Sequence, residues 1–160
     1  MKNFPGKLVV LLIILFLGCN PCGNYDVEDF KRELPLINRI KDIIVEQSLF
    51  GENNFVDLDI LKTKINVSEY RTLEKLNLQS ITKWNDVILF KFSTGKELNY
   101  FQKLGENTDH KACNTYLFYS KNKTQRHEYA NYERYIECRT AFKDMGAHWT
   151  YLSQSQDCAD

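Results

Sequence analysis

The sequence has no excess of charge of either sign, because 21 basic residues balance 21 acidic residues along its 160 positions. Without a basic face, nucleic acid is not expected as a partner. No block of like charges indicates a disordered tail, and the chain has neither an internal repeat nor a low-complexity stretch. What remains is a chain of ordinary composition, long enough for one domain with a real hydrophobic core.

Recognisable catalytic motifs are also missing. The chain has no Gly-x-Ser-x-Gly elbow of the kind that presents a nucleophilic serine. Two acids near expected loops could serve a hydrolase, but a scatter of acids is typical of a solvated surface. The candidates are Asp57, Asp59, Asp86, Asp109 and Asp144. We therefore expect a protein that is not an enzyme, with a small envelope hydrolase as the alternative.

The longest apolar run lies near the N-terminus. Lys2 and Lys7 give this region a positive start, and Leu8–Leu17 is apolar over about ten residues, the usual length of a signal-peptide core. A helix that spans a bilayer needs roughly twenty such residues, so the run is too short for a permanent span. The sequence predicts a signal peptide over residues 1–18.

The end of this run carries a second motif. Leu15-Phe16-Leu17-Gly18-Cys19 resembles the lipobox of bacterial lipoproteins, although Phe16 stands where that family prefers an aliphatic residue. The resemblance implies that Cys19 carries a diacylglyceryl group, that the chain is cut just before it, and that the new amine is acylated. Each buried methylene contributes about 0.8 kcal/mol, so several acyl chains give a stable anchor. Residues 19–25 would then be a lipidated tether on the outer face of a bacterial membrane, in the cell envelope.

Plain secretion is the alternative to lipid anchoring. It includes a eukaryotic source, in which Asn66 and Asn122 would be glycosylation acceptors, because each begins an Asn-x-Ser/Thr triplet.

Apart from the lipobox residue, four cysteines remain, and they are Cys22, Cys113, Cys138 and Cys158. An even number of cysteines in an exported protein predicts two disulfides. Four cysteines allow three pairings, and free buried thiols are the alternative to all of them.

One pairing follows from the expected strands. Cys113 lies just before an expected strand at 115–120, and Cys158 lies just after a strand that begins near Trp149. If these strands pair antiparallel, the two cysteines share one edge of the sheet and can form a disulfide, which leaves the other two cysteines for a second bridge. A parallel arrangement, with a crossover helix over 125–142, would place them at opposite ends.

Neither a metal site nor a redox site is expected. His110 and Cys113 lie three residues apart, and further zinc ligands could come from His127, Cys138 and His148. No second short-spaced ligand pair accompanies them, and an oxidising compartment favours disulfides. Cys19 and Cys22 have the CxxC spacing of a redox motif but follow the signal core directly, outside a βαβ context. We expect no metal ion and no other cofactor.

Helices are expected in the first half of the chain. Apolar residues at helical spacing predict a helix over 27–49, with Pro35 as a kink or restart and Gly51 as the stop. The predicted buried stripe is Val27, Phe30, Leu34, Leu36, Ile40, Ile43, Ile44 and Gln47. Residues 53–65 fit either a strand or a helix, and a capping arrangement introduces a short helix over 68–77.

Strands are expected in the second half. Val87–Phe92 is a strong strand run, and Leu98–Leu104 is its predicted hairpin partner. Thr115–Ser120 and Trp149–Ser153 are two further strands, while 129–138 fits a helix better than a strand. This order favours an α+β fold, with N-terminal helices packed on one face of a four- to five-stranded, mainly antiparallel sheet.

Aromatic content is the one oddity of composition, because nine Tyr, ten Phe and two Trp make up 13% of the chain. The tyrosines of the later half are Tyr100, Tyr116, Tyr119, Tyr129, Tyr132, Tyr135 and Tyr151. Tyrosine combines an apolar body with a polar tip, which suits a binding surface or sugar stacking. The alternative is that these rings fill the second face of the sheet.

We expect residues 26–160 to form a single non-enzymatic binding or interaction domain, held at the membrane through lipid on Cys19. Its partner would be a protein, an envelope component or a polysaccharide, and an immunity or inhibitor protein is one concrete version. The alternatives are the small envelope hydrolase and a plain secreted domain stabilised by disulfides. A cleft with converging acids or a histidine would favour the hydrolase, and a flat or convex Tyr-rich face would favour the binder.

Overall fold

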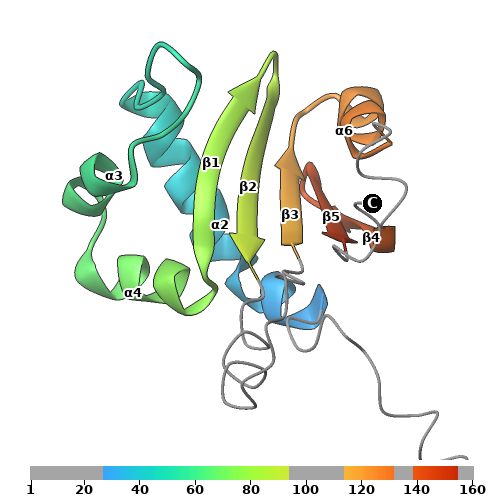
Figure 1. The fold of residues 1–160 in the computed structure, drawn as a ribbon, viewed down its shortest axis with the longest axis horizontal. Coiled ribbons are helices and arrows are strands. Elements are labelled where there is room, and N and C mark those ends of the chain that lie inside the picture. Colours follow the sequence, from blue (N-terminus) through green and yellow to red (C-terminus); the bar gives the residue numbers. More distant parts are fainter. Residues whose placement is uncertain (1–26, 94–113, 132–138, 155–160) are drawn as a thin grey trace, which may run out of the picture.

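The computed structural model of the protein describes residues 27–93, 114–131 and 139–154 (Figure 1). The signal peptide, the tether and all of the cysteines lie outside these ranges. The lipidation of Cys19 and both disulfides therefore stay predictions.

Three described helices precede the sheet, and they are α2 (Val27–Glu46), α3 (Leu58–Lys64) and α4 (Val67–Lys75). The described strands are β1 (Leu78–Trp84), β2 (Val87–Ser93), β3 (Asn114–Tyr119), β4 (Arg139–Gly146) and β5 (Trp149–Gln154). They form one sheet in the order β1-β2-β3-β5-β4, and every neighbouring pair is antiparallel. Helix α6 (Lys123–Ala130) lies between β3 and β4 in the chain. The α+β fold predicted from the order of elements is confirmed.

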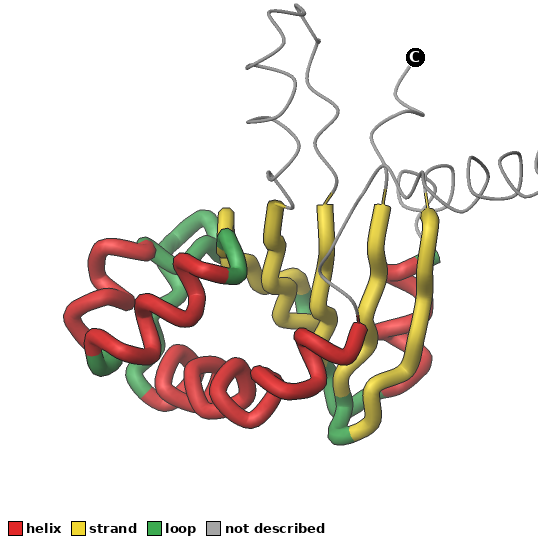
Figure 2. Tube along the Cα trace, turned by 90° about the horizontal axis from the view of Figure 1, so that it is seen from below, coloured by secondary structure: helices red, strands yellow, loops and turns green. Residues whose placement is uncertain are grey.

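The helices form two groups around this sheet. Figures 1 and 2 show α2, α3 and α4 together, with α2 running along the sheet, whereas α6 lies apart from them at the end of the sheet that holds β5 and β4. The two groups pack on opposite faces, which we call the inner face (toward α2) and the outer face (toward α6).

Helix α2 ends at Glu46, so the predicted stop at Gly51 is wrong. The N–H of Leu49 donates to the carbonyl of Ile44 over 3.0 Å, and the N–H of Ser48 donates to the carbonyl three residues earlier over 3.2 Å. Ser48 has a positive φ of 53°. This pair of bonds is a Schellman motif, which ends a helix with one left-handed residue, here a serine in place of the usual glycine.

The inner core lies between α2 and the sheet. Phe30 packs against two rings of the sheet, with centroid distances of 5.0 Å to Phe92 and 5.8 Å to Tyr151. Ile40 and Ile44, predicted to be buried one turn apart, are both fully buried. The apolar stripe therefore orients α2 as the sequence predicted.

Some details of α2 differ from the prediction. The helix continues through the exposed Pro35 as one element, and Gln47 lies beyond its end and is exposed. Ile37 and Lys41 were left out of the predicted stripe but are buried. They lie four residues apart and share a face, and the Lys41 ammonium stays 3.9 Å from the centroid of the Tyr119 ring.

Helices α3 and α4 begin at strong caps. The Asp57 carboxylate accepts the N–H of Asp59 over 2.8 Å at the start of α3. Asn66 and Glu69 form a reciprocal capping box at the start of α4, as the sequence predicted. Residues 53–65, which fitted either a strand or a helix, contain both, because a short bridged segment leads into α3.

Strand β2 takes β1 and β3 as its two neighbours. The predicted hairpin between β2 and Leu98–Leu104 is therefore wrong, because β1 and β3 occupy both sides of β2. Residues 98–104 lie outside the described residues. β1 was not predicted, because Ile81 is its one buried side chain and the strand lacks an apolar pattern. Asn85, with a φ of 51°, begins the tight turn that joins β1 to β2.

Strand β5 pairs with β3 on one side and with β4 on the other. The antiparallel pairing of β3 with β5 is the arrangement that the sequence predicted, and it opposes Asn114 to Gln154. This confirms the premise of the predicted Cys113–Cys158 disulfide but does not test the bond. β4 was not predicted, because no element was assigned to residues 139–146. The stretch interpreted as helix, 129–138, ends before this strand and lies mostly outside the described residues.

Candidate functional site

The outer face of the sheet divides into a covered part and a hollowed part. Helix α6 packs over β3 and β5, where Ala130 is fully buried. Arg126 attaches this helix to the sheet. Its Nε donates to Thr150 Oγ1 over 3.2 Å, and its guanidinium also donates to the carbonyl of Ser120. The part of the same face over β1 and β2 carries a groove of about 460 Å³, which we call the outer groove.

Strand register brings the floor of the outer groove together. Ser80 of β1 lies opposite Lys91 of β2, which in turn lies opposite Tyr116 of β3. Two residues further along β1, Thr82 lies opposite Leu89. Side chains two residues apart on a strand share a face, so these two rows point into the same groove.

One wall of the groove comes from a short segment that runs beside β1. Phe55 forms an antiparallel bridge with Thr82, and the N–H of Lys83 donates to the carbonyl of Asn54 over 2.8 Å. Val56 is buried in the inner core, so alternation along this segment turns Phe55 outward. The Phe55 side chain is 56% exposed.

Trp84 also lines the outer groove. It ends β1, is 60% exposed, and its ring lies 5.3 Å from the ring of Tyr129 on α6. Asn85 Nδ2 donates to Tyr129 Oη over 3.1 Å. Burial raises the pKa of the Tyr129 phenol, although the bond from Asn85 acts in the opposite direction. The phenol therefore stays protonated at neutral pH and links the hairpin turn to α6.

The charge in the groove is positive. Lys83 and Lys91 are the charged residues among its described lining, which contains no carboxylate and no histidine. The Lys83 ammonium lies 5.8 Å from the centroid of Phe50, a residue that packs on the inner core. Lys91 lies on the floor, is partly buried, and has no ion-pair partner within the described ranges. The groove thus offers rings, hydroxyls, amides and the ammonium groups of two lysines.

The predicted acids do not converge. Asp57 caps α3, Asp59 lies in its first turn, and Asp86 lies in the β1–β2 turn. Asp144 accepts the N–H of Gly146 over 3.0 Å, and this bond, with help from Lys123, lowers the pKa of its carboxyl. Asp109 lies outside the described residues. The described acids thus serve capping, turns and exposed ion pairs.

The two described histidines lie on different elements. His127 of α6 packs edge-on against Phe142 at 5.5 Å, and His148 in the β4–β5 turn packs edge-on against Tyr119 at 6.2 Å. Within the described ranges, no group of three His, Cys, Asp or Glu side chains could hold a metal ion. His110, Cys113 and Cys138 lie outside those ranges.

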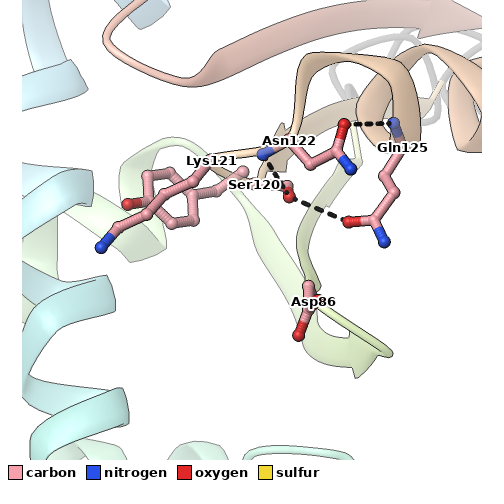
Figure 3. Close-up of a pocket in the computed structure, with 6 residues that line it drawn as sticks. Asp86, Ser120, Lys121, Asn122 and Gln125 are labelled. Carbon is pink, nitrogen blue, oxygen red and sulfur yellow. Dashed lines mark hydrogen bonds between the residues drawn. The ribbon is translucent and has the colours of Figure 1, made fainter.

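A second pocket, of about 310 Å³, lies where β3 leads into α6 (Figure 3). Its polar groups bond to one another: Asn122 Oδ1 accepts the N–H of Gln125 over 3.4 Å, and Ser120 Oγ accepts the N–H of Asn122 over 3.1 Å. Asp86 approaches from the β1–β2 turn (Figure 3). These bonds cap α6, so the pocket is a weaker candidate than the outer groove.

An aromatic binding surface built from the later tyrosines stays a prediction, and Tyr100, Tyr132 and Tyr135 lie outside the described residues. Tyr116 and Tyr151 are buried, so these rings fill the sheet as the alternative interpretation held. Tyr129 contacts the Trp84 ring but is not among the residues that line the outer groove. Phe55 and Trp84 themselves were not predicted. A useful signal would have been a large ring directly before the Asn85-Asp86 turn, at the end of an otherwise polar segment.

Comparison with protein families, with curated proteins and with solved structures found no match to this chain. Within the described ranges, no helix combines the length and the apolar character needed to cross a bilayer.

Proposed function

We propose that this protein is a non-enzymatic binding domain on a lipid tether and that the outer groove is its binding site. The observation that carries the proposal is that two large exposed rings, Phe55 and Trp84, line the same polar groove. Large exposed apolar side chains gathered at one site are typical of interaction surfaces.

Both rings are held in place. The Phe55 backbone is fixed by bridging to β1, and Trp84 packs against Tyr129. A ligand that contacts these rings does not need to order a loop first. Pre-organisation of this kind lowers the entropic cost of binding.

The lining supports binding better than hydrolysis. A hydrolase that uses general acid and base groups needs two titratable side chains within reach of the substrate. The described lining supplies lysines, hydroxyls and amides, with neither a carboxylate nor a histidine. The small envelope hydrolase therefore remains the weaker alternative.

The length of the tether limits the distance between the groove and the membrane. Between Cys19 and Val27, the start of α2, about eight residues can span at most roughly 28 Å. Lipid on Cys19 would thus keep the domain within a short distance of the membrane surface. There it would meet envelope polymers and proteins.

Site-specific photo-crosslinking in living cells tests this function. A photoreactive phenylalanine analogue at Phe55 in the full-length chain should form adducts with a partner, and Trp84→Ala should reduce them. The same analogue at Val67, which is 69% exposed on α4, is the matched control and should give none of these adducts. Equal labelling at both positions, or no labelling at Phe55, would show that the outer groove is not the binding site.

A further inference from the structure

We propose that the ligand of the outer groove is an acidic polysaccharide, in which the carboxylate of a uronic acid unit pairs with Lys91 and sugar faces pack on Trp84 and Phe55. This inference rests on the proposed binding function and names the chemical class of its ligand.

The position of Lys91 carries the argument for an anion. It lies on the floor of the groove, on an interior strand of the sheet, and is partly buried without an ion-pair partner in the described part of the chain. Lys41, which is buried on the other side of the sheet, has both Asp42 at 2.7 Å and the Tyr119 ring. The Lys91 ammonium is thus free to pair with an anion in the groove, and an anionic ligand would supply a counterion that the described lining lacks.

The rest of the lining fits a sugar better than a protein. A sugar ring presents apolar C–H faces and a rim of hydroxyls. Aromatic side chains can contact the faces, and Ser80, Thr82 and Asn54 can bond to hydroxyls. The buried centre of a protein interface is more apolar than this floor, where Leu89 is the aliphatic side chain.

The spacing of the groups suits an oligosaccharide. Lys91 lies opposite Ser80, and Trp84 follows four residues later on β1. At about 3.3 Å per residue, the backbone positions of these two rows are about 13 Å apart along the strand. A short oligosaccharide can contact side chains from both rows at once.

Intrinsic fluorescence gives a direct test, because the chain has two tryptophans and Trp149 is fully buried. The probe pair is polygalacturonate oligomers and their methyl esters, which share a backbone but differ in charge. The full-length lipidated protein in nonionic detergent should show a saturable change in Trp84 emission with the acidic oligomers. The methyl esters should bind more weakly than the acidic oligomers by about tenfold or more. Trp84→Phe should abolish the signal.

Substitutions at Lys91 separate charge recognition from groove binding. Lys91→Met should lower affinity for the acidic oligomers by about tenfold or more, and Lys91→Arg should keep most of it. Lys121→Met, an exposed lysine at the second pocket, is the matched control and should bind like the wild type. Added salt should weaken the binding of the acidic oligomers more than that of the esters.

Several results would overturn the proposal. Equal affinity for acid and ester, or wild-type binding by Lys91→Met, would exclude recognition of the carboxylate while leaving a Trp84-dependent groove intact. Failure of both oligomers, with Phe55 crosslinking retained, would show that the ligand is of another class. Lys91-dependent binding to phosphatidylglycerol vesicles, without binding to the oligomers, would identify the membrane surface as the occupant.

Discussion

The two faces of the sheet use the same strands but are closed to different extents. On the inner face, α2 covers cross-strand rows such as Phe90, Leu117 and Tyr151, each of which is nearly or fully buried. On the outer face, α6 covers β3 and β5, whereas the exposed rings of Phe55 and Trp84 border a groove over β1 and β2.

This difference separates stability from recognition. Burial of apolar surface is the main favourable contribution to folding, so the closed inner face should dominate the free energy of unfolding. Large rings that stay exposed do not contribute this free energy to folding. When a ligand covers them, the burial of the same apolar surface contributes to binding instead. Substitutions on the two faces should therefore have distinguishable effects.

The largest effect is expected on the inner face. Ile40→Ala should lower the free energy of unfolding by about 2–5 kcal/mol, because it removes a fully buried side chain of α2. Val45→Ala, at an exposed position of the same helix, should change it by less than about 0.5 kcal/mol. Denaturant unfolding followed by circular dichroism measures both. Similar free energies of unfolding for the two variants would show that the packing of α2 does not stabilise the core.

A disulfide between Cys113 and Cys158 would hold the paired ends of β3 and β5 independently of either face. By the loop-entropy relation, a bridge of this span contributes about 4 kcal/mol, which reduction should remove. Non-reducing peptide mapping should find the linked pair. A peptide that joins Cys138 to either partner would contradict the prediction.

The covered part of the outer face should show an intermediate effect. Arg126→Met removes the donors to Thr150 Oγ1 and to the carbonyl of Ser120, both at buried residues. Leaving buried acceptors unsatisfied should cost about 1–3 kcal/mol. Arg71→Met, at an exposed position of α4, is the control and should leave unfolding nearly unchanged. Equal stability of the two variants would mean that α6 is not held by this guanidinium.

The smallest effect on stability is expected at the open groove. Trp84→Ala removes an exposed ring whose main described contact is Tyr129, so unfolding should change by at most about 1 kcal/mol. The same substitution should reduce partner crosslinking at Phe55. A large loss of stability would instead place Trp84 among the structural residues and remove the contrast between the faces.

Some elements could be predicted because their signals are local. The capping box of Asn66 and Glu69 needs only neighbouring residues, and β2 is apolar over most of its length because it lies inside the sheet. Strand β1 could not be predicted, because Ile81 is its one buried side chain and the polar Ser80 and Thr82 occupy most of its outward positions.

The candidate site was harder to predict than the fold. The tyrosines of the later half of the chain drew attention to aromatic surface, but Tyr116 and Tyr151 belong largely to packed layers of the sheet. Phe55 and Trp84 are far apart in the sequence, and each reads as an isolated apolar residue in a polar segment. Their relation depends on the bridge that aligns the Phe55 segment with β1.

The sequence by itself determined the α+β class, helix α2, the capped helix α4 and the strands β2, β3 and β5, because periodicity, capping and apolar runs act between near neighbours. Only the tertiary structure decided that β1 and β4 complete the sheet, that α6 covers one end of the outer face, and that Lys91, Phe55 and Trp84 line one groove. Those outcomes depend on strand register, which joins residues far apart in the chain and assigns each side chain to a face.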